Sequence, residues 1–202
     1  MLFGMLTSTV QVRLAPGRDL SVRNRHPWLF SGAIASVEGG DGSLIARAEV
    51  YDAEGRWLAR GVFHSEAELA VRLYTWDPDE EPGPELVARR IRAAVARREA
   101  ILKKCPDHET NAFRLVHSEA DGLSGLIVDR YADALSIRVG AAAIAEWLDA
   151  VLKTVRELPD VTRVIVRTDP EAAARERLDE AAIAACSCGA SDVTFQESGA
   201  LF

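Results

Sequence analysis

The 202-residue sequence has little sulfur and lacks any long apolar run. Its three cysteines, Cys105, Cys186 and Cys188, are too few for a disulfide framework or a four-ligand zinc site, so we expect reduced thiols and no metal site. No stretch approaches the roughly eighteen apolar residues that a membrane span needs, and the first residues lack the pattern of a signal peptide. These absences predict a cytoplasmic protein without a membrane partner.

Positive charge is also in short supply. The chain has 24 lysines and arginines against 31 acidic residues, a formal net charge of −7. Taken alone, this balance argues against a polyanionic partner, because nonspecific affinity for nucleic acids comes largely from Lys and Arg. Any nucleic-acid binding must therefore depend on where the positive residues cluster.

The first part of the chain has the pattern of short strands separated by turns. We expect strands at 10–14, 28–34, 48–51, 57–63 and 70–74, with residues 52–55 forming a hairpin loop. These features predict a small β-rich domain over residues 1–76.

An acidic segment with three prolines follows at residues 77–84 and marks a domain boundary, because proline cannot continue a strand. We then expect one helix near 85–104, strands at 113–117, 125–129, 134–139 and 161–167, and helices at 141–158 and 170–188. This order predicts a compact α+β domain over residues 85–190. Residues 192–202 read as a strand, a turn and a second strand that is cut off, so we expect 191–202 to begin a further, truncated domain.

Two clusters of basic residues are candidates for binding RNA. The first is the run 23–32, where guanidiniums could pair with phosphates and flat rings could stack on an unpaired base, although the rings could equally be core residues. The second is one face of the helix at 85–104, which is either an ordinary solvated face or an RNA-facing stripe. The candidate RNA-binding residues are Arg23, Arg25, His26, Trp28, Arg89, Arg90, Arg92, Arg97 and Arg98.

Other groups of reactive residues look structural. His117, Glu119 and Asp121 could suit a metal or an acid/base pair, but they lie in an expected turn beside Gly122, where acids commonly bind the backbone. The glycines at 39–42 stand between strands with no helix behind them, so they do not form the glycine-rich turn that holds a nucleotide-type cofactor. We therefore expect no catalytic, cofactor-binding or metal-binding residue in this chain.

Three runs of the sequence resemble a known family. Residues 25–34, 55–61 and 114–131, in this order, are similar to the front half of the bacterial large-subunit ribosomal RNA cytosine-5 methyltransferases. Ser124 departs from the family, which tends to have proline there. The resemblance implies a PUA domain first, a small α+β domain second, and a Rossmann methyltransferase domain third, which uses S-adenosylmethionine (SAM) and which we expect to be absent from this chain.

Such methylation uses a cysteine thiolate that adds to the base. Cys186 and Cys188 stand among acids, which disfavour a thiolate, so we expect inert thiols. We therefore predict the RNA-binding, N-terminal region of a SAM-dependent 23S ribosomal RNA (cytosine-5) methyltransferase, noncatalytic by itself, with ribosomal RNA rather than DNA as its partner. A free-standing PUA-type RNA-binding module, a nonfunctional fragment and a protein-interaction piece are the alternatives, and a homodimer is left open.

Overall fold

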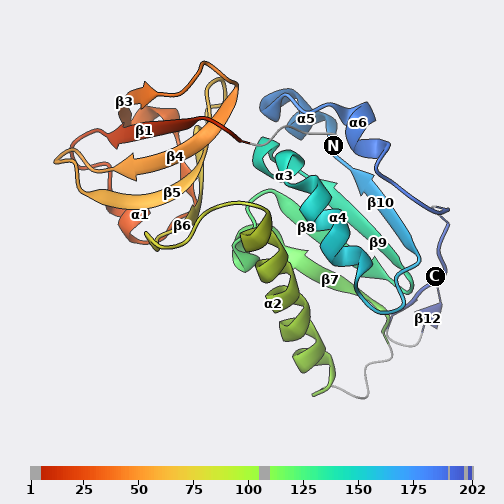
Figure 1. Cartoon of the computed structure of the whole chain (residues 1–202). Helices are drawn as coiled ribbons and strands as arrows, with labels where there is room; N and C mark the ends of the chain where they lie inside the picture. Colours follow the sequence, from red (N-terminus) through yellow and green to blue (C-terminus); the bar gives the residue numbers. More distant parts are fainter. Residues whose placement is uncertain (1–5, 105–109, 191, 198–199, 202) are drawn as a thin grey trace. The chain divides into compact units, whose positions relative to one another are not determined.

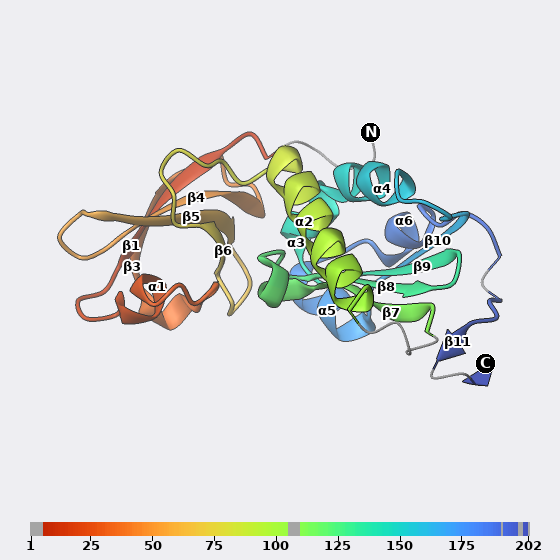
Figure 2. The same ribbon diagram turned by 90° about the horizontal axis from the view of Figure 1, so that it is seen from below.

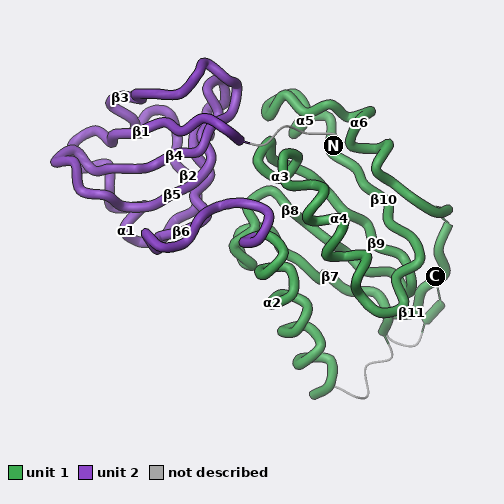
Figure 3. Tube along the Cα trace, viewed as in Figure 1, with its two compact units in different colours: residues 1–2, 87–202 green, residues 3–86 purple. Residues whose placement is uncertain are grey.

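The computed structural model describes residues 6–104, 110–190, 192–197 and 200–201. The chain divides into two compact units, one ending at Leu86 and the other beginning at Val87 (Figure 3). Each unit contains its own principal sheet. Within the described residues, no helix combines the length and apolar character needed to cross a membrane.

The first unit is built on a six-stranded sheet with the order β2-β6-β5-β4-β1-β3 (Figure 1). All neighbouring strands are antiparallel except β1 and β4, which are parallel. The strands are β1 (Thr9–Leu14), β2 (Trp28–Leu29), β3 (Ile34–Gly39), β4 (Ile45–Tyr51), β5 (Trp57–His64) and β6 (Val71–Thr75).

Alternation along the strands produces the core of this unit. In β1, Val10, Val12 and Leu14 are buried while the residues between them are exposed. Val22, from the short helix α1 (Leu20–Arg23), packs into the same apolar cluster as Leu29 of β2. The core therefore fixes both ends of the segment that joins α1 to β2.

The predicted strand at 28–34 is largely wrong. Only Trp28–Leu29 is a strand, and a 3-10 turn, η1 (Ser31–Ala33), follows before β3 begins at Ile34. Ser31 and Gly32 favour a turn over an extended chain, and the Ser31 amide donates to the Glu68 carbonyl instead of to a neighbouring strand. The strand β3 itself was missed.

The predicted hairpin between residues 48 and 63 is confirmed as β4 and β5. Its loop is organised by Asp52, a buried carboxylate that accepts hydrogen bonds from the amides of Glu54 and Arg56. Asp side chains commonly close turns in this way.

The second unit contains a four-stranded sheet with the order β10-β9-β8-β7 and several helices. The strands β7, β8 and β9 are antiparallel, whereas β9 and β10 are parallel. The elements are α2 (Pro84–Leu102), β7 (Ala112–His117), η2 (Ser118–Asp121), β8 (Leu126–Tyr131), β9 (Ala134–Val139), α3 (Ala142–Glu146), α4 (Leu148–Arg156), β10 (Arg163–Arg167), α5 (Pro170–Glu176), α6 (Glu180–Ala184), β11 (Gln196–Glu197) and β12 (Ala200–Leu201).

Two expected helices are broken in the structure. The helix predicted at 141–158 is interrupted at Trp147, which separates α3 from α4. The one predicted at 170–188 is split because Arg177 adopts φ 53° and Asp179 starts a new helix by accepting from the Ala182 amide. The helix at 85–104 and the strands of this unit lie close to their predicted positions.

One face of this sheet is covered by helices. Figure 2 shows α4 and α6 on the same side of the strands. An ion pair of 2.9 Å between Arg92 of α2 and Glu157, just beyond α4, joins α2 to α4. Leu135, Ile137 and Val164 are buried beneath them. The connection from β9 through α3 and α4 to the parallel strand β10 is a βαβ crossover.

Candidate RNA-binding surface

The segment between α1 and β2 presents aromatic rings at the surface of the first unit. Trp28 is 37% exposed and Phe30 is 46% exposed, so neither ring is a full core residue. Their ring centroids are 6.5 Å apart in an edge-to-face arrangement, and the His26 ring contacts Trp28 in the same way at 5.8 Å. Of the two interpretations of these aromatics, the structure favours exposed rings on an ordered backbone.

The same segment holds its backbone in an unusual conformation. Arg25 adopts φ 59°, in the left-handed region that non-glycine residues rarely enter. The amides of Arg25 and His26 donate to the carbonyls of Val22 and Ser21, both at 2.9 Å, which closes the turn after α1. The turn leaves Arg25 exposed.

A shallow pocket of about 470 Å³ lies beside these rings. Within the described part of the chain, neither Arg18 at the pocket nor the nearby Arg25 forms an ion pair. The pocket therefore combines flat apolar surface with positive charge that is free to pair with an anion. Its lining residues are Arg18, Ser21, His26, Trp28, Leu29, Phe30, Gly32 and Ala33.

Arg23, in contrast, is tied into the fold. Its guanidinium pairs with Asp19 at 2.5 Å and with the buried Asp52 at 2.8 Å. Burial alone would raise the pKa of Asp52, but hydrogen bonds from Arg56 and the charge of Arg23 lower it below its usual value. Asp52 thus remains an anion that binds Arg23 and Arg56.

The arginines of α2 are also largely paired. Arg97 and Arg98 both bind Asp121, Arg92 pairs with Glu157, and Arg90 donates to the Gly122 carbonyl at 2.7 Å. Arg89 is exposed but also has an interaction partner. The structure therefore uses much of the predicted basic stripe inside the second unit.

Asp121 organises the segment considered above as a metal or acid/base site. Its carboxylate is 2% exposed and accepts hydrogen bonds from Arg97, Arg98 and the His117 amide. Although burial raises the pKa of Asp121, the hydrogen bonds from Arg98 and His117 outweigh it, and the pKa is lowered. The carboxylate is an anchor for α2.

The surroundings of Cys186 disfavour a reactive thiolate. Burial, followed by the charge of Asp149, raises the pKa of Cys186, whose Sγ donates to the Ala182 carbonyl at 3.4 Å. Cys188 is exposed, and Cys105 lies outside the described residues.

At pH 7 we expect iodoacetamide to alkylate Cys186 at least tenfold more slowly than Cys188, as followed by peptide mass spectrometry, because only the thiolate reacts. Equal rates would show that Cys186 is more accessible and more acidic than its surroundings imply.

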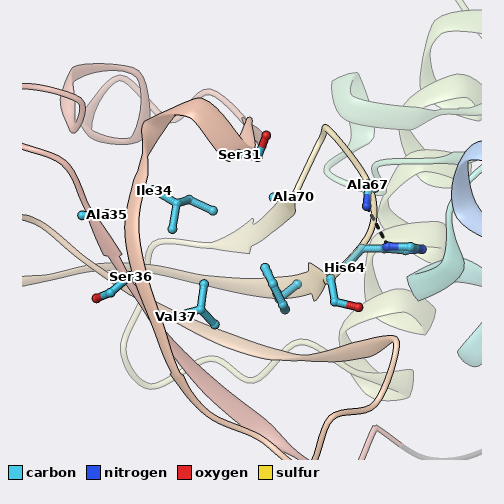
Figure 4. Close-up of a pocket in the computed structure, with 10 residues that line it drawn as sticks. Ser31, Ile34, Ala35, Ser36, Val37, His64, Ala67 and Ala70 are labelled. Atoms are coloured by element: carbon cyan, nitrogen blue, oxygen red, sulfur yellow. Dashed lines mark hydrogen bonds between the residues drawn. The ribbon is translucent and has the colours of Figure 1, made fainter.

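A second pocket of the first unit has a different character. It has a volume of about 260 Å³ and lies between β3 and β5, and most of its lining is small or apolar (Figure 4). His64 turns toward the Ala67 amide, from which its Nδ1 accepts a hydrogen bond of 3.1 Å. Because Nδ1 also accepts from Glu66, the imidazole is held in a fixed orientation. This pocket offers no lysine or arginine to an anion.

Comparison with known proteins identifies the first unit. Residues 12–76 match the family model described as a PUA-like domain. Most of the first unit is thus similar to a PUA-like domain. This confirms the fold that the resemblance implied for the front of the chain.

Most of the chain is similar to curated ribosomal RNA methyltransferases. It is 34% identical over 170 residues to ribosomal RNA large subunit methyltransferase I from Shewanella frigidimarina. This alignment covers 84% of this chain and 42% of that protein. With the protein of the same name from Serratia proteamaculans, it shares 38% identity over 148 residues, covering 72% and 36%. The chain thus spans less than half the length of these relatives.

Solved structures share its fold. A crystal structure described as that of a methyltransferase complexed with SAH matches 96% of this chain and 47% of its own length, with a TM-score of 0.70 at 12% identity. A protein described as a SAM-dependent methyltransferase from Streptococcus mutans matches 78% of this chain and 40% of its own, with a TM-score of 0.64 at 11% identity.

This likeness corrects the predicted fold class, in which a compact α+β domain followed the PUA-like unit and the Rossmann methyltransferase domain was absent. Methyltransferase structures cover 78–96% of the chain, and the second unit resembles part of their fold. Its β9-to-β10 crossover is the parallel βαβ arrangement that Rossmann-like sheets repeat. The prediction was wrong because it relied on a glycine-rich signature, which a βαβ unit does not require.

Proposed function

We propose that this chain binds ribosomal RNA through the aromatic pocket of its PUA-like domain, as the RNA-binding region of a SAM-dependent 23S ribosomal RNA (cytosine-5) methyltransferase. The observation that supports this most is the juxtaposition of exposed rings with arginines that lack an acidic partner among the described residues. The names of the curated relatives point in the same direction.

The pocket has the chemistry that an unstacked nucleotide requires. Trp28 and Phe30 offer flat apolar faces on which a base can stack, and Arg18 and Arg25 offer cations for the flanking phosphates. Because the overall charge is negative, such local cations would set the place of binding. A duplex hides its base faces, so the pocket should favour single-stranded or looped RNA over duplex DNA.

The remaining sequence-based sites have a weaker basis. A direct role for Arg89, Arg90, Arg92, Arg97 and Arg98 in RNA binding stays a prediction, since most of them already bind groups of this chain. Cytoplasmic location and a homodimer likewise stay predictions.

SAM use by the whole protein is proposed from its relatives, and one turn of this chain can be tested for fit. The turn from β9 into α3 contains Gly140, as a strand-to-helix cofactor turn would. However, the carboxylate of Glu176 already accepts from the Ala142 amide at 3.0 Å, and the Gly140 amide donates to the Gly125 carbonyl. An anionic side chain thus occupies the start of α3, so this turn does not fit the carboxylate or ribose of SAM, and we assign no residue of it to the cofactor.

Two substitutions test the RNA-binding surface with a fragment of large-subunit ribosomal RNA. Phe30→Ala should weaken binding by roughly tenfold, because stacking on one base contributes about 1–3 kcal/mol. Arg25→Glu should reduce the slope of log affinity against log salt by about 0.7, the value for one lost contact with a single strand. Filter binding between low and moderate salt measures both.

The matched control is Arg13→Glu, which makes the same charge change at an exposed position of β1 away from the pocket lining. It should leave the salt slope unchanged. If all three variants bind as the parent protein does, the aromatic pocket is not the RNA site.

A further inference from the structure

The second unit has a sheet face that is distinct from the one beneath its helices. In β9 and β10, Ile137 and Val166 are buried, whereas the alternating residues Arg138 and Arg167 are exposed. Because successive side chains of a strand point to opposite sides, these arginines lie on the face opposite the helix-covered core. We name this surface the open face, made by Arg114, His117, Ile127, Asp129, Tyr131, Ser136, Arg138, Arg163, Ile165 and Arg167.

Arg138 and Arg167 are direct neighbours on this face. They are register partners in the parallel pair of β9 and β10. Neither forms an ion pair or a side-chain hydrogen bond with any residue that the structure describes. Like charges that face each other across two strands destabilise a sheet, and no residue that the structure describes in the second unit offsets this repulsion with an ion pair to either arginine.

The other arginines of the open face are neutralised by carboxylates. Arg114 pairs with Asp129 at 2.7 Å, and Arg163 pairs with Asp133. The hydrogen bond from the Arg163 guanidinium lowers the pKa of Asp133 to about 2. The unbalanced positive charge is therefore concentrated at Arg138 and Arg167.

The rest of the face suits a nucleotide chain. The register places His117 opposite Ile127 and Ile127 opposite Arg138, so an imidazole and an apolar side chain continue the row that the arginines begin. A hollow of about 390 Å³ lies next to this row and is lined in part by Arg114, His117 and Tyr131. A single strand of RNA could place its phosphates at Arg138 and Arg167 and a sugar or base over Ile127.

We propose that Arg138 and Arg167 form a phosphate-binding site for the ribosomal RNA backbone, so that the second unit contacts RNA through its open face. This inference rests on the proposed function and adds a second contact region to it. The choice of RNA follows from the charge and from the half-buried apolar neighbours Ile127 and Ile165, which a compact inorganic anion would not need.

The test uses the full chain and a single-stranded fragment of large-subunit ribosomal RNA. In the double variant Arg138→Gln, Arg167→Gln, the salt slope should fall by about 1.4, the loss of two single-strand contacts. The double variant Arg138→Lys, Arg167→Lys keeps both charges and should keep most of the slope. The control Lys103→Gln, Lys153→Gln removes two exposed cations from outside the open face and should change nothing.

Thermal unfolding of the same proteins separates function from folding. Because the glutamine variant removes a like-charge repulsion, its Tm should equal or exceed that of the parent. A lowered Tm would mean that the arginines serve the fold, and an unchanged salt slope would mean that they do not touch RNA; either result overturns the inference. If the salt slope of the double glutamine variant equals that of the parent while Phe30→Ala still weakens binding, only the open-face site fails. Failure of the proposed function would instead appear as no RNA binding by the parent chain.

Discussion

Replacing Gly61 with alanine should strongly destabilise the PUA-like unit and weaken its RNA binding. Gly61 in β5 lies opposite Leu73 in β6, next to an irregularity in the register. A Cβ at this position would stand 2.2 Å from the Arg72 carbonyl oxygen and 2.9 Å from its carbonyl carbon. Both contacts are with backbone, so no rotamer change relieves them, and β5 and β6 must separate.

The consequence reaches the candidate site through the sheet. The strand β6 pairs with β2 on its other edge, where Trp28 is the register partner of Arg72. A displaced β6 therefore releases the strand that positions the aromatic rings. We expect a loss of about 3 kcal/mol or more in the free energy of unfolding, at the upper end of the cost of overpacking.

Chemical denaturation followed by Trp fluorescence measures this loss, and filter binding measures the loss of RNA affinity. Gly32→Ala is the matched control for stability, because a Cβ there meets nothing within 4 Å and the backbone is not in the left-handed region. Its free energy of unfolding should change by no more than about 0.5 kcal/mol. An unfolding midpoint for Gly61→Ala equal to that of the parent would show that β5 and β6 tolerate a wider spacing.

Local patterns predicted most of the elements, because their cause is local. Alternation at 10–14 and 70–74 marked β1 and β6, and the acidic turn at 52–55, recognisable from its Asp and Gly, marked the hairpin of β4 and β5. The break at Trp147 and the short β2 were missed, since both depend on contacts made in the folded chain. Gly61 gave no signal at all, because its requirement for a missing side chain arises only from the register of β5 against β6.

The candidate site was predictable only in part for the same reason. The run containing His26 and Trp28 stood out by composition, and the structure places both at one surface pocket. Pairing could not be foreseen: Asp121 is remote from Arg97 in sequence but binds it at 2.5 Å. The open face also required the parallel pairing that brings Arg138 beside Arg167, although the alternation within β9 already indicated that Arg138 points away from the core.

Removing the charge of Asp121 should strongly destabilise the second unit. The carboxylate is 2% exposed and binds two guanidiniums and the His117 amide. Loss of one partner from a buried ion pair costs about 3–5 kcal/mol. Because Arg97 is 53% exposed and can recover hydration, we expect a value near the lower limit, about 3 kcal/mol, for Asp121→Ala.

Urea denaturation at pH 7 gives this value, with Glu157→Gln as the matched control. Glu157 also binds an arginine of α2, but both partners are at least half exposed, so its loss should cost less than about 1 kcal/mol. Equal effects of the two variants would contradict the anchoring role of Asp121.

The pH dependence of stability provides an independent test of Asp121. Its folded-state pKa is lowered below the ordinary value of 3.8 for an aspartate, so the carboxylate binds fewer protons in the folded chain than in the unfolded chain. Its contribution is therefore complete above pH 3.8 and is lost as the pH falls through the lowered folded pKa. Asp121→Asn should flatten this part of the stability curve relative to the parent. The same variant also tests whether the basic face of α2 binds RNA, because it frees Arg97 and Arg98 from the anion that they share. RNA affinity at pH 7 should rise if these arginines face RNA. It should stay constant if their function is to hold α2 against the sheet.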